Sequence, residues 1–330
     1  QRQMCIRDRF IVAACMLLGI LSSCSYLDVV PDEKATEKDA FEDKDAAKRF
    51  VYSCYAYIPN PRSGTGSLDL FTSDEVVTAF EHETFAAFPK GNYSASNPVI
   101  SYWNSLFQGI KQCYILLNNI DMVPALEASI KADYIAQAKF LIAYYHFLLV
   151  QGWYEVPIRK ETVKDITVSS LEATPHAEAL DWIIQEMEDC LDMVDNSSYD
   201  QSPSHVKKTV VEGILARVCL WRAGEPSKGG KPYYEKAAKY AKAVYDSKKH
   251  KLNPDVYAMW QALASDQYET TYNESMWEVE FVGTRDDGSY TESRIGNVIG
   301  NLQENSAGTG AGYTYAFYAC LLYTSPSPRD

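Results

Sequence analysis

The sequence predicts a mostly α-helical protein in which helix pairs stack as an irregular solenoid, followed by a loop-rich region with minor β structure. Three observations predict this fold. Apolar residues recur at helical spacing in six segments between residues 46 and 247. One of these segments, Asp133–Pro157, is apolar on every face between Phe140 and Val150, so neighbouring helices must cover it. From Gly283 onward glycines are frequent and long apolar runs are few.

Both ends of the chain carry sequence that resembles translated sequencing adapter rather than protein. These stretches are residues 1–9 and 320–330, and we exclude them from the fold prediction. On this interpretation both natural termini are missing and the chain is truncated. The net charge of −13 becomes −15 once the +2 of residues 1–9 is removed, because residues 320–330 contribute zero. So acidic a chain argues against nucleic acid and anionic membrane surfaces as partners.

Residues 10–23 are predicted to be a lipoprotein signal peptide. Phe10–Ile20 is an uncharged apolar run, shorter than the roughly 20 residues that span a bilayer. Leu21-Ser22-Ser23-Cys24 resembles the bacterial lipobox, in which the cysteine is lipidated, so Cys24 is the predicted lipidation site and membrane anchor. A plain secretory signal is the alternative. Residues 24–45 carry eight carboxylates against three lysines and are predicted to form an acidic tether.

The helical domain is predicted to cover residues 46–252. Its first helix begins at Ala46, continues through Phe50 and Cys54, and stops at Pro59. Residues 60–101 then lose regular periodicity and are rich in Gly, Ser, Pro, Asn and Tyr. Irregular segments of this length are often functional, so we expect this one to display binding residues.

The later helices follow from apolar spacing, and Thr174 with Pro175 is predicted to be the cap and first-turn pair of one of them. Ala136-x-x-x-Phe140 matches part of the second helix of a tetratricopeptide repeat, although the period along the chain is not constant. We therefore predict a tetratricopeptide-like helical solenoid, with an ordinary helical bundle as the alternative. The later predicted helices are residues 102–123, 133–152, 174–194, 207–223 and 233–247.

A second, loop-rich region is predicted for residues 253–319. Within it, residues 275–282 alternate between apolar and polar side chains in the manner of a short β-strand. No helix is predicted after Ser247.

Four cysteines remain once the predicted adapter, signal and anchor positions are set aside. Each lies on or beside the apolar face of a predicted helix, and no two of them form a C-x-x-C motif. Buried thiols are therefore favoured over disulfides, and a metal site is disfavoured. The four are Cys54, Cys113, Cys190 and Cys219.

No catalytic motif appears in the sequence, and no metal or cofactor is predicted. The five histidines are scattered, and His146 lies in the most apolar helix, where a hydrogen-bonded core position is favoured over a ligand role. Asp286-Asp287-Gly288 could begin a calcium-binding turn, but a plain turn is favoured because the other ligands are missing. The 44 carboxylates do not by themselves indicate a glycosidase pair, because close pairs occur in any acidic fold.

Binding through aromatic side chains is easier to support. The chain has 24 tyrosines against 12 phenylalanines, and tyrosine combines an apolar face with a polar group. Trp103 is in phase with its helix, which favours core packing, whereas Tyr93 lies in a Gly-Asn-Tyr-Ser loop and has no helical role. The candidate ligand-binding residues are Asp74, Glu75, Tyr93, Tyr102, Trp103, Arg285 and Tyr290.

Several segments together resemble the SusD/RagB nutrient-uptake lipoproteins of Bacteroidetes. Their order and spacing cover roughly Cys24 to Phe281. The segments are the lipobox, Tyr26–Pro31, Ala138–Tyr145 with Val156-Pro157, Ala216–Leu220, Ala237–Tyr245 and Glu278–Phe281.

The resemblance implies a surface-exposed outer-membrane lipoprotein with a tetratricopeptide-like helical body. It also implies that the protein binds oligosaccharide or another nutrient and delivers it to a SusC-like TonB-dependent transporter, without catalysis. Family members are longer, so part of the binding site is expected outside this chain. Two other functions stay open from the residues alone: a surface-anchored glycoside hydrolase, and a helical-repeat adaptor that binds only protein.

Overall fold

The computed structural model describes residues 41–59, 76–78, 87, 90–94, 96, 102–161, 171–195, 203–265, 267–280 and 318–320. Within these ranges the chain is mostly helical, as predicted. The elements are α2 (Lys44–Tyr55), β1 (Val76–Thr78), α4 (Trp103–Asn119), the 3₁₀ turn η4 (Ile120–Met122), α5 (Ala128–Trp153), α6 (His176–Glu188), α7 (Lys208–Ala223), α8 (Lys231–Ser247), α9 (Val256–Ala264) and β2 (Tyr318–Cys320).

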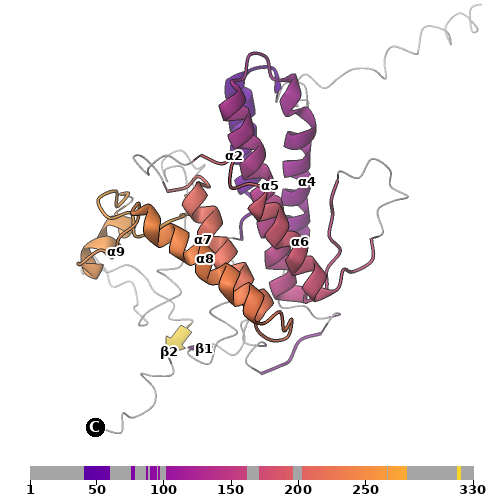
Figure 1. Cartoon of the computed structure of the whole chain (residues 1–330), viewed down its shortest axis with the longest axis vertical. Helices are drawn as coiled ribbons and strands as arrows, with labels where there is room; N and C mark the ends of the chain where they lie inside the picture. Colours follow the sequence, from indigo (N-terminus) through magenta and orange to yellow (C-terminus); the bar gives the residue numbers. More distant parts are fainter. Residues whose placement is uncertain are drawn as a thin grey trace, which may run out of the picture.

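The helices pack in the order in which they follow one another along the chain. Helix α2 contacts α4 and α5, and each helix from α4 to α8 then packs against the next one. Figure 1 shows α2, α4 and α5 side by side, with α6 next to α5 and with α7 and α8 farther along. This consecutive stacking is the solenoid-like arrangement that the sequence predicted.

Helix α5 is the centre of the core. The predicted all-round apolar stretch is buried from Phe140 to Val150, with only Tyr144 and Leu148 partly exposed. Because α2, α4 and α6 pack against it, residues on opposite sides of α5 are both removed from water. The prediction that this helix lies inside the fold is confirmed, and burying its large apolar side chains supplies about 1.5–3 kcal/mol each.

One glycine sets the distance between α4 and α5. A Cβ atom placed on Gly109 would lie 2.6 Å from Cε2 of Tyr145 and 2.8 Å from Cβ of Tyr57. The missing side chain therefore makes room for the ring of Tyr145 between α2, α4 and α5. The Tyr145 hydroxyl donates a hydrogen bond of 2.5 Å to the carbonyl of Cys54 at the end of α2, which satisfies a buried polar group.

The segment after α9 covers another side of α5. The ring centroid of Trp277 lies 5.7 Å from that of Phe140 and 5.1 Å from that of Tyr144, and its indole N–H donates to the carbonyl of Ser204 at 3.1 Å. Residues 275–280 had been predicted to begin a strand, and they do not form one. They pack instead as a single segment, in which the Glu278 N–H donates to the Pro203 carbonyl.

Helix α2 begins at Lys44, two residues before the predicted start, because Asp43 caps it. The Asp43 carboxylate accepts a 2.7 Å hydrogen bond from the N–H of Ala46. Just before the cap, Phe41 is buried, and its ring centroid lies 4.8 Å from that of Phe50. The helix ends at Tyr55, before the predicted stop at Pro59.

Two other local predictions differ from the structure. Thr174 does not cap α6: it forms an isolated antiparallel bridge with Val156, and Pro175 occupies the cap position. The Thr174 hydroxyl oxygen, which would have to act as the cap, instead accepts from the Ile158 N–H at 3.4 Å, and the Thr174 N–H donates to the Val156 carbonyl. Helix α9 lies in a region that was predicted to be loop, because its nine residues are too few to show a clear periodicity.

Cys54, Cys113, Cys190 and Cys219 are buried free thiols, as predicted. The β structure within the described ranges is one antiparallel pair, β1 with β2, in which Val77 lies opposite Ala319. This pair is not the predicted β structure, which was placed at residues 275–282, and β2 ends at Cys320, a residue that had been assigned to the adapter-like end.

Candidate ligand-binding site

The structure describes three of the seven predicted ligand-binding residues. Tyr93, Tyr102 and Trp103 lie in the described ranges. The other predicted positions lie outside those ranges: Asp74, Glu75, Arg285 and Tyr290, together with the lipidation site Cys24 and the Asp286-Asp287-Gly288 turn.

Tyr102 and Trp103 belong to a group of rings where the start of α4 meets the end of α5. The centroid of Trp153 lies 5.0 Å from that of Trp103 and 5.5 Å from that of Tyr102, with edge-to-face geometry in both pairs. Trp103 also lies 5.0 Å from Phe107. We call these four residues, Tyr102, Trp103, Phe107 and Trp153, the aromatic cluster. All four are partly exposed, so they both pack on the core and reach the surface.

The local sequence explains why these rings meet. Helices α4 and α5 are joined by a short connection through η4, so they run antiparallel and the first turn of α4 faces the last turn of α5. Tyr154 then ends α5 in an unusual backbone conformation with φ of +67°. Its ring is half exposed and stacks on His176 at the start of α6, with centroids 4.4 Å apart. Tyr154 therefore links the end of α5 to the start of α6 through its contact with the buried His176 ring.

Tyr93 lies in the irregular segment that precedes α4, and its side chain is 55% exposed. This position agrees with its predicted lack of a helical role. Trp103 also agrees with the prediction of packing, since it contacts the hydrophobic core. The sequence did not single out Trp153 or Tyr154, which stand 50 and 51 residues away from Trp103. A Trp-Tyr pair directly after Gly152 at a helix end is the signal that could have found them.

His146 lies behind the aromatic cluster and is fully buried. Its Nδ1–H donates to the Ile142 carbonyl at 2.8 Å, and its Nε2 accepts from the Arg159 N–H at 3.1 Å. Burial lowers the pKa of His146 to about 4, so the ring is neutral near pH 7. Since both ring nitrogens are used in holding α5 to the 156–159 segment, His146 is a structural residue, as predicted.

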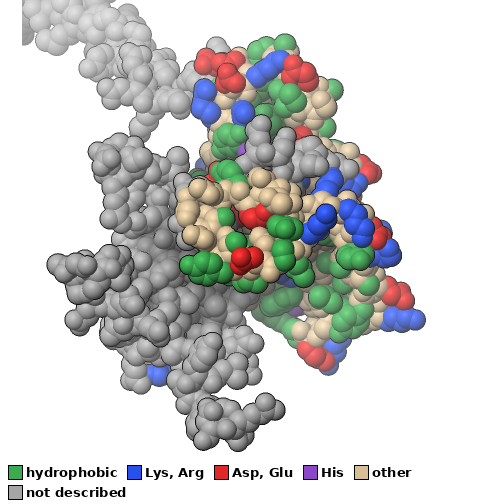
Figure 2. Space-filling view, turned by 90° about the vertical axis from the view of Figure 1, so that its left-hand side faces the viewer, with side chains coloured by type: hydrophobic (Ala, Val, Ile, Leu, Met, Phe, Trp, Pro, Cys, Tyr) green, Lys and Arg blue, Asp and Glu red, His purple; other side chains and the backbone are tan. Residues whose placement is uncertain are grey.

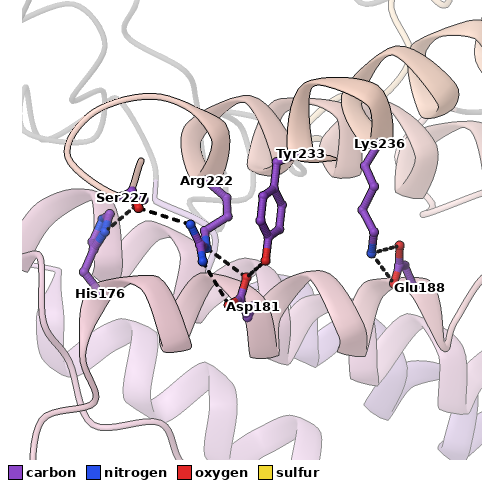
Figure 3. A network of polar contacts seen from close by, with 7 residues as sticks. All are labelled: His176, Asp181, Glu188, Arg222, Ser227, Tyr233 and Lys236. Atoms are coloured by element: carbon purple, nitrogen blue, oxygen red, sulfur yellow. Dashed lines mark hydrogen bonds and ion pairs between the residues drawn. The ribbon is translucent and has the colours of Figure 1, made fainter. Parts of the chain in front are cut away.

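A polar network joins α6, α7 and α8 (Figure 3). Arg222 of α7 donates to both oxygens of Asp181 of α6, with Nε to Oδ1 at 2.8 Å and a second nitrogen to Oδ2 at 3.2 Å. Tyr233 of α8 donates to the same carboxylate at 2.5 Å, and its ring centroid lies 4.4 Å from the Arg222 guanidinium carbon. Such a bidentate pair fixes orientation as well as adding energy.

The same network fixes the loop between α7 and α8. Arg222 also donates to the Ser227 carbonyl at 3.2 Å, and the Ser227 hydroxyl bonds to Nδ1 of His176 at 2.8 Å. A Cβ atom on Gly229 would lie 2.5 Å from the Arg222 carbonyl oxygen, so only glycine fits this close approach. Although a serine and a histidine are adjacent here, the contacts describe a loop attachment, and His176 itself is covered by Tyr154.

No metal-binding cluster of three or more His, Cys, Asp or Glu side chains occurs in the described part of the chain. Among the described residues, no helix combines the length and the apolar character needed to cross a membrane.

The sequence matches a protein-family model over residues 25–220. That model, SusD-like, is described as starch-binding and associating with the outer membrane. No curated protein sequence matches the chain.

Solved structures resemble the fold. A SusD homologue from Bacteroides thetaiotaomicron superposes with a TM-score of 0.74 at 20% identity, covering 87% of this chain and 56% of that one. A SusD superfamily protein from Parabacteroides distasonis gives 0.61 at 23% identity, covering 76% and 52%. A laminarin-binding SusD-like protein gives 0.59 at 18% identity, covering 72% and 51%. The chain spans about half the length of these structures.

Proposed function

Because the chain belongs to the SusD-like family of starch-binding, outer-membrane-associated proteins, we propose that it is a surface lipoprotein that captures glycans. In this proposal Cys24 carries the lipid anchor in the outer membrane, and the helical body faces the cell exterior. The protein binds oligosaccharide and passes it to a SusC-like TonB-dependent transporter, without making or breaking covalent bonds.

The observation that carries this proposal is the family match, which extends from Ser25 through almost all of α7. The aromatic cluster supports it. Sugar rings present C–H faces that pack on aromatic rings, while their hydroxyl groups need polar partners, and Tyr and Trp offer both kinds of contact. Trp153 and Tyr102 are partly exposed, and the half-exposed Tyr154 follows Trp153 directly in the chain. Tyr93 is an exposed candidate from the irregular segment.

Calorimetry with defined glycans tests the binding step. The protein is prepared without residues 1–24, so that it is free of lipid, and is titrated with starch-derived and laminarin-derived oligosaccharides. We expect saturable binding of at least one glycan, weakened about tenfold or more by Tyr154→Ala because a half-exposed ring that stacks sugar is a typical binding hot spot. Tyr245→Ala is the matched control, since Tyr245 is 73% exposed on α8, far along the solenoid from α5.

The result that overturns glycan capture is the absence of binding to every poly- and oligosaccharide offered. Release of reducing sugar during the same incubations, lost on neutralising one carboxylate, would instead favour a hydrolase.

Delivery to a transporter needs a separate test. The lipidated protein is co-expressed with a SusC-like TonB-dependent transporter, and the detergent-solubilised membranes are separated by native electrophoresis. We expect the two proteins to migrate together and Cys24→Ala to reduce the amount of complex in the membrane fraction. Independent migration of the two proteins under conditions that preserve other outer-membrane complexes would contradict the transporter partnership.

A further inference from the structure

A polar pocket opens at the other end of α5, away from the aromatic cluster. Its volume is about 260 Å³, and it lies where α2, the first turns of α5 and the segment before α7 meet. The lining residues that matter here are Lys48, Tyr52, Asp133, Gln137, His205 and Lys207. We call this site the polar pocket.

The floor of the pocket is fixed by directed hydrogen bonds between three distant segments. Asp133 accepts from the Asp195 N–H at 2.7 Å and from the Gln137 amide at 2.6 Å. The Gln137 carbonyl oxygen accepts from the Tyr55 hydroxyl at 2.6 Å, and that hydroxyl accepts from the Val206 N–H at 3.2 Å. Gln137 is only 4% exposed. Because these hydrogen bonds already fix the floor, less conformational entropy is lost when a ligand binds to it.

One wall of the pocket is aromatic. The Tyr52 ring lies 5.3 Å from the His205 ring between centroids, and the Lys48 ammonium lies 5.8 Å from the Tyr52 centroid. Tyr52 is 42% exposed, so part of its ring is available to a ligand. Burial lowers the pKa of His205, which leaves its ring neutral near pH 7.

The charges that line the pocket are balanced. Two lysines, Lys48 and Lys207, stand with two carboxylates, Asp133 and Asp195, and the Lys207 ammonium lies 3.6 Å from the Asp195 carboxylate. A charged ligand would therefore meet repulsion as well as attraction, whereas a neutral ligand with many hydroxyl groups can donate to the carboxylates and accept from the ammonium groups. The volume lies below the range of about 300–1,000 Å³ that is typical of drug-sized ligands, which suits a single ring.

We propose that the polar pocket is a second sugar site that binds one uncharged pyranose ring. The ring packs on Tyr52, and its hydroxyl groups bond to Asp133 and Lys48. The site is about 30 Å from the aromatic cluster, since Asp133 and Trp153 are separated by 20 residues of one α-helix. The inference rests on the proposed glycan binding, because the sugar in the pocket would be a monosaccharide unit of the same class of ligand.

The test is a ligand-observed NMR titration of the lipid-free full chain with glucose, glucuronate and glucosamine. We expect glucose to bind saturably and more tightly than either charged sugar. Tyr52→Ala should weaken glucose binding about tenfold or more, and Lys48→Ala should weaken it less. Both residues are exposed on α2, and a thermal melt of each variant verifies that it is folded.

Control variants separate this site from the aromatic cluster. Tyr154→Ala should weaken oligosaccharide binding while leaving glucose binding unchanged, and Tyr245→Ala should change neither. Tighter binding of glucuronate or glucosamine than of glucose would overturn the neutral-ligand assignment. Oligosaccharide binding with no effect of Tyr52→Ala on glucose would overturn the second site alone, whereas no binding of any sugar to the wild-type chain would overturn glycan capture as well.

Discussion

The two ends of α5 are built by different physical means. At its N-terminal end, Asp133 and Gln137 join α2 to the segment before α7 through hydrogen bonds between residues that are far apart in sequence. At its C-terminal end, Trp153 packs on Trp103 and Tyr102 through ring contacts. A hydrogen bond fixes the positions of its two groups, and its stabilisation is lost when one partner is missing. The stabilisation from ring packing instead increases with the buried area. The first end therefore suits selective recognition of one small ligand, and the second suits a broad stacking surface.

Between these ends, from Phe140 to Val150, α5 is buried except at Tyr144 and Leu148, so it holds the two proposed sites at a constant separation. A single rigid helix thus allows each end to be altered while the other serves as an internal reference.

Removing the central ring of the aromatic cluster should have the largest effect. Trp153→Ala is expected to lower the free energy of unfolding by about 3 kcal/mol, because a partly buried indole loses its packing against two other rings. Urea denaturation followed by circular dichroism measures this change. Trp260→Ala is the matched control, since Trp260 is 63% exposed on α9 and should cost little. Equal losses in the two variants would contradict a packing role for the cluster.

The pH dependence of stability should report the titration of His146, which is buried in the C-terminal half of α5. Its folded-state pKa of about 4 lies below the unfolded value of 6.5, so the unfolded chain binds more protons between these values. Stability is therefore fully present above about pH 6.5 and falls as pH decreases toward 4, with a loss of about 2 kcal/mol between pH 7 and pH 5. Urea denaturation across this range measures the slope, which His146→Gln should flatten.

At the N-terminal end of α5, Asp133 should have the opposite effect on the pH dependence of stability. Burial raises the pKa of Asp133, so the folded chain retains a proton more readily than the unfolded chain as its carboxyl titrates. As pH falls through the range in which the Asp133 carboxyl titrates, proton binding by Asp133 therefore favours the folded state. Asp133→Asn removes this effect, so it should make acid destabilisation steeper than it is in the wild type. A slope that becomes shallower in Asp133→Asn would contradict the assignment.

The hydrogen bonds of the polar pocket predict a smaller loss. Tyr55→Phe leaves the Gln137 carbonyl and the Val206 N–H without their shared partner, and should cost about 1–2 kcal/mol. Tyr52→Phe, three residues earlier on the same helix, serves as the control and should be close to neutral in urea denaturation. If Tyr55→Phe is also neutral, water replaces the hydroxyl and the floor is less rigid than the geometry indicates.

The smallest effect is expected for an ion pair at the very start of α5. Lys44 and Glu127 form a contact of 2.5 Å, and about half of each side chain is exposed. Solvent screens such pairs and ordering both side chains costs entropy, so Lys44→Ala should leave the midpoint of urea unfolding within experimental error. A clear destabilisation would show that the connection between α2 and α5 depends on charge as well as on the buried bonds of Tyr55.

Most of the fold could be predicted from local sequence patterns. Apolar spacing located α2 and α4 to α8, and the run from Phe140 to Val150 identified the central helix, because continuous apolar character has few explanations in a non-membrane segment. The wrong local predictions arose where a residue bonds to another segment or where a helix is short. Thr174 has the chemistry of a cap but bonds to Val156 instead, and α9 is too short for its pattern to be recognised.

The candidate sites were less predictable. Tyr102 and Trp103 were named as candidates because they are aromatic residues at the end of an irregular segment, and they stay predictions. Trp153 was missed, since its proximity to Trp103 depends on α4 and α5 running antiparallel. The polar pocket carried no sequence signal at all, because Tyr55 and Val206 are 151 residues apart and meet only in the folded chain.

The helical class, the burial of α5 and the family can be read from the sequence alone, since these depend on the periodicity and order of residues along the chain. Which residues from distant segments come together depends on tertiary packing. Whether Trp153 meets Trp103, or Asp133 meets Asp195, depends on the packing of whole helices against one another. Local propensity carries no information on such contacts, because it depends on neighbours in the sequence and these residues are far apart along the chain.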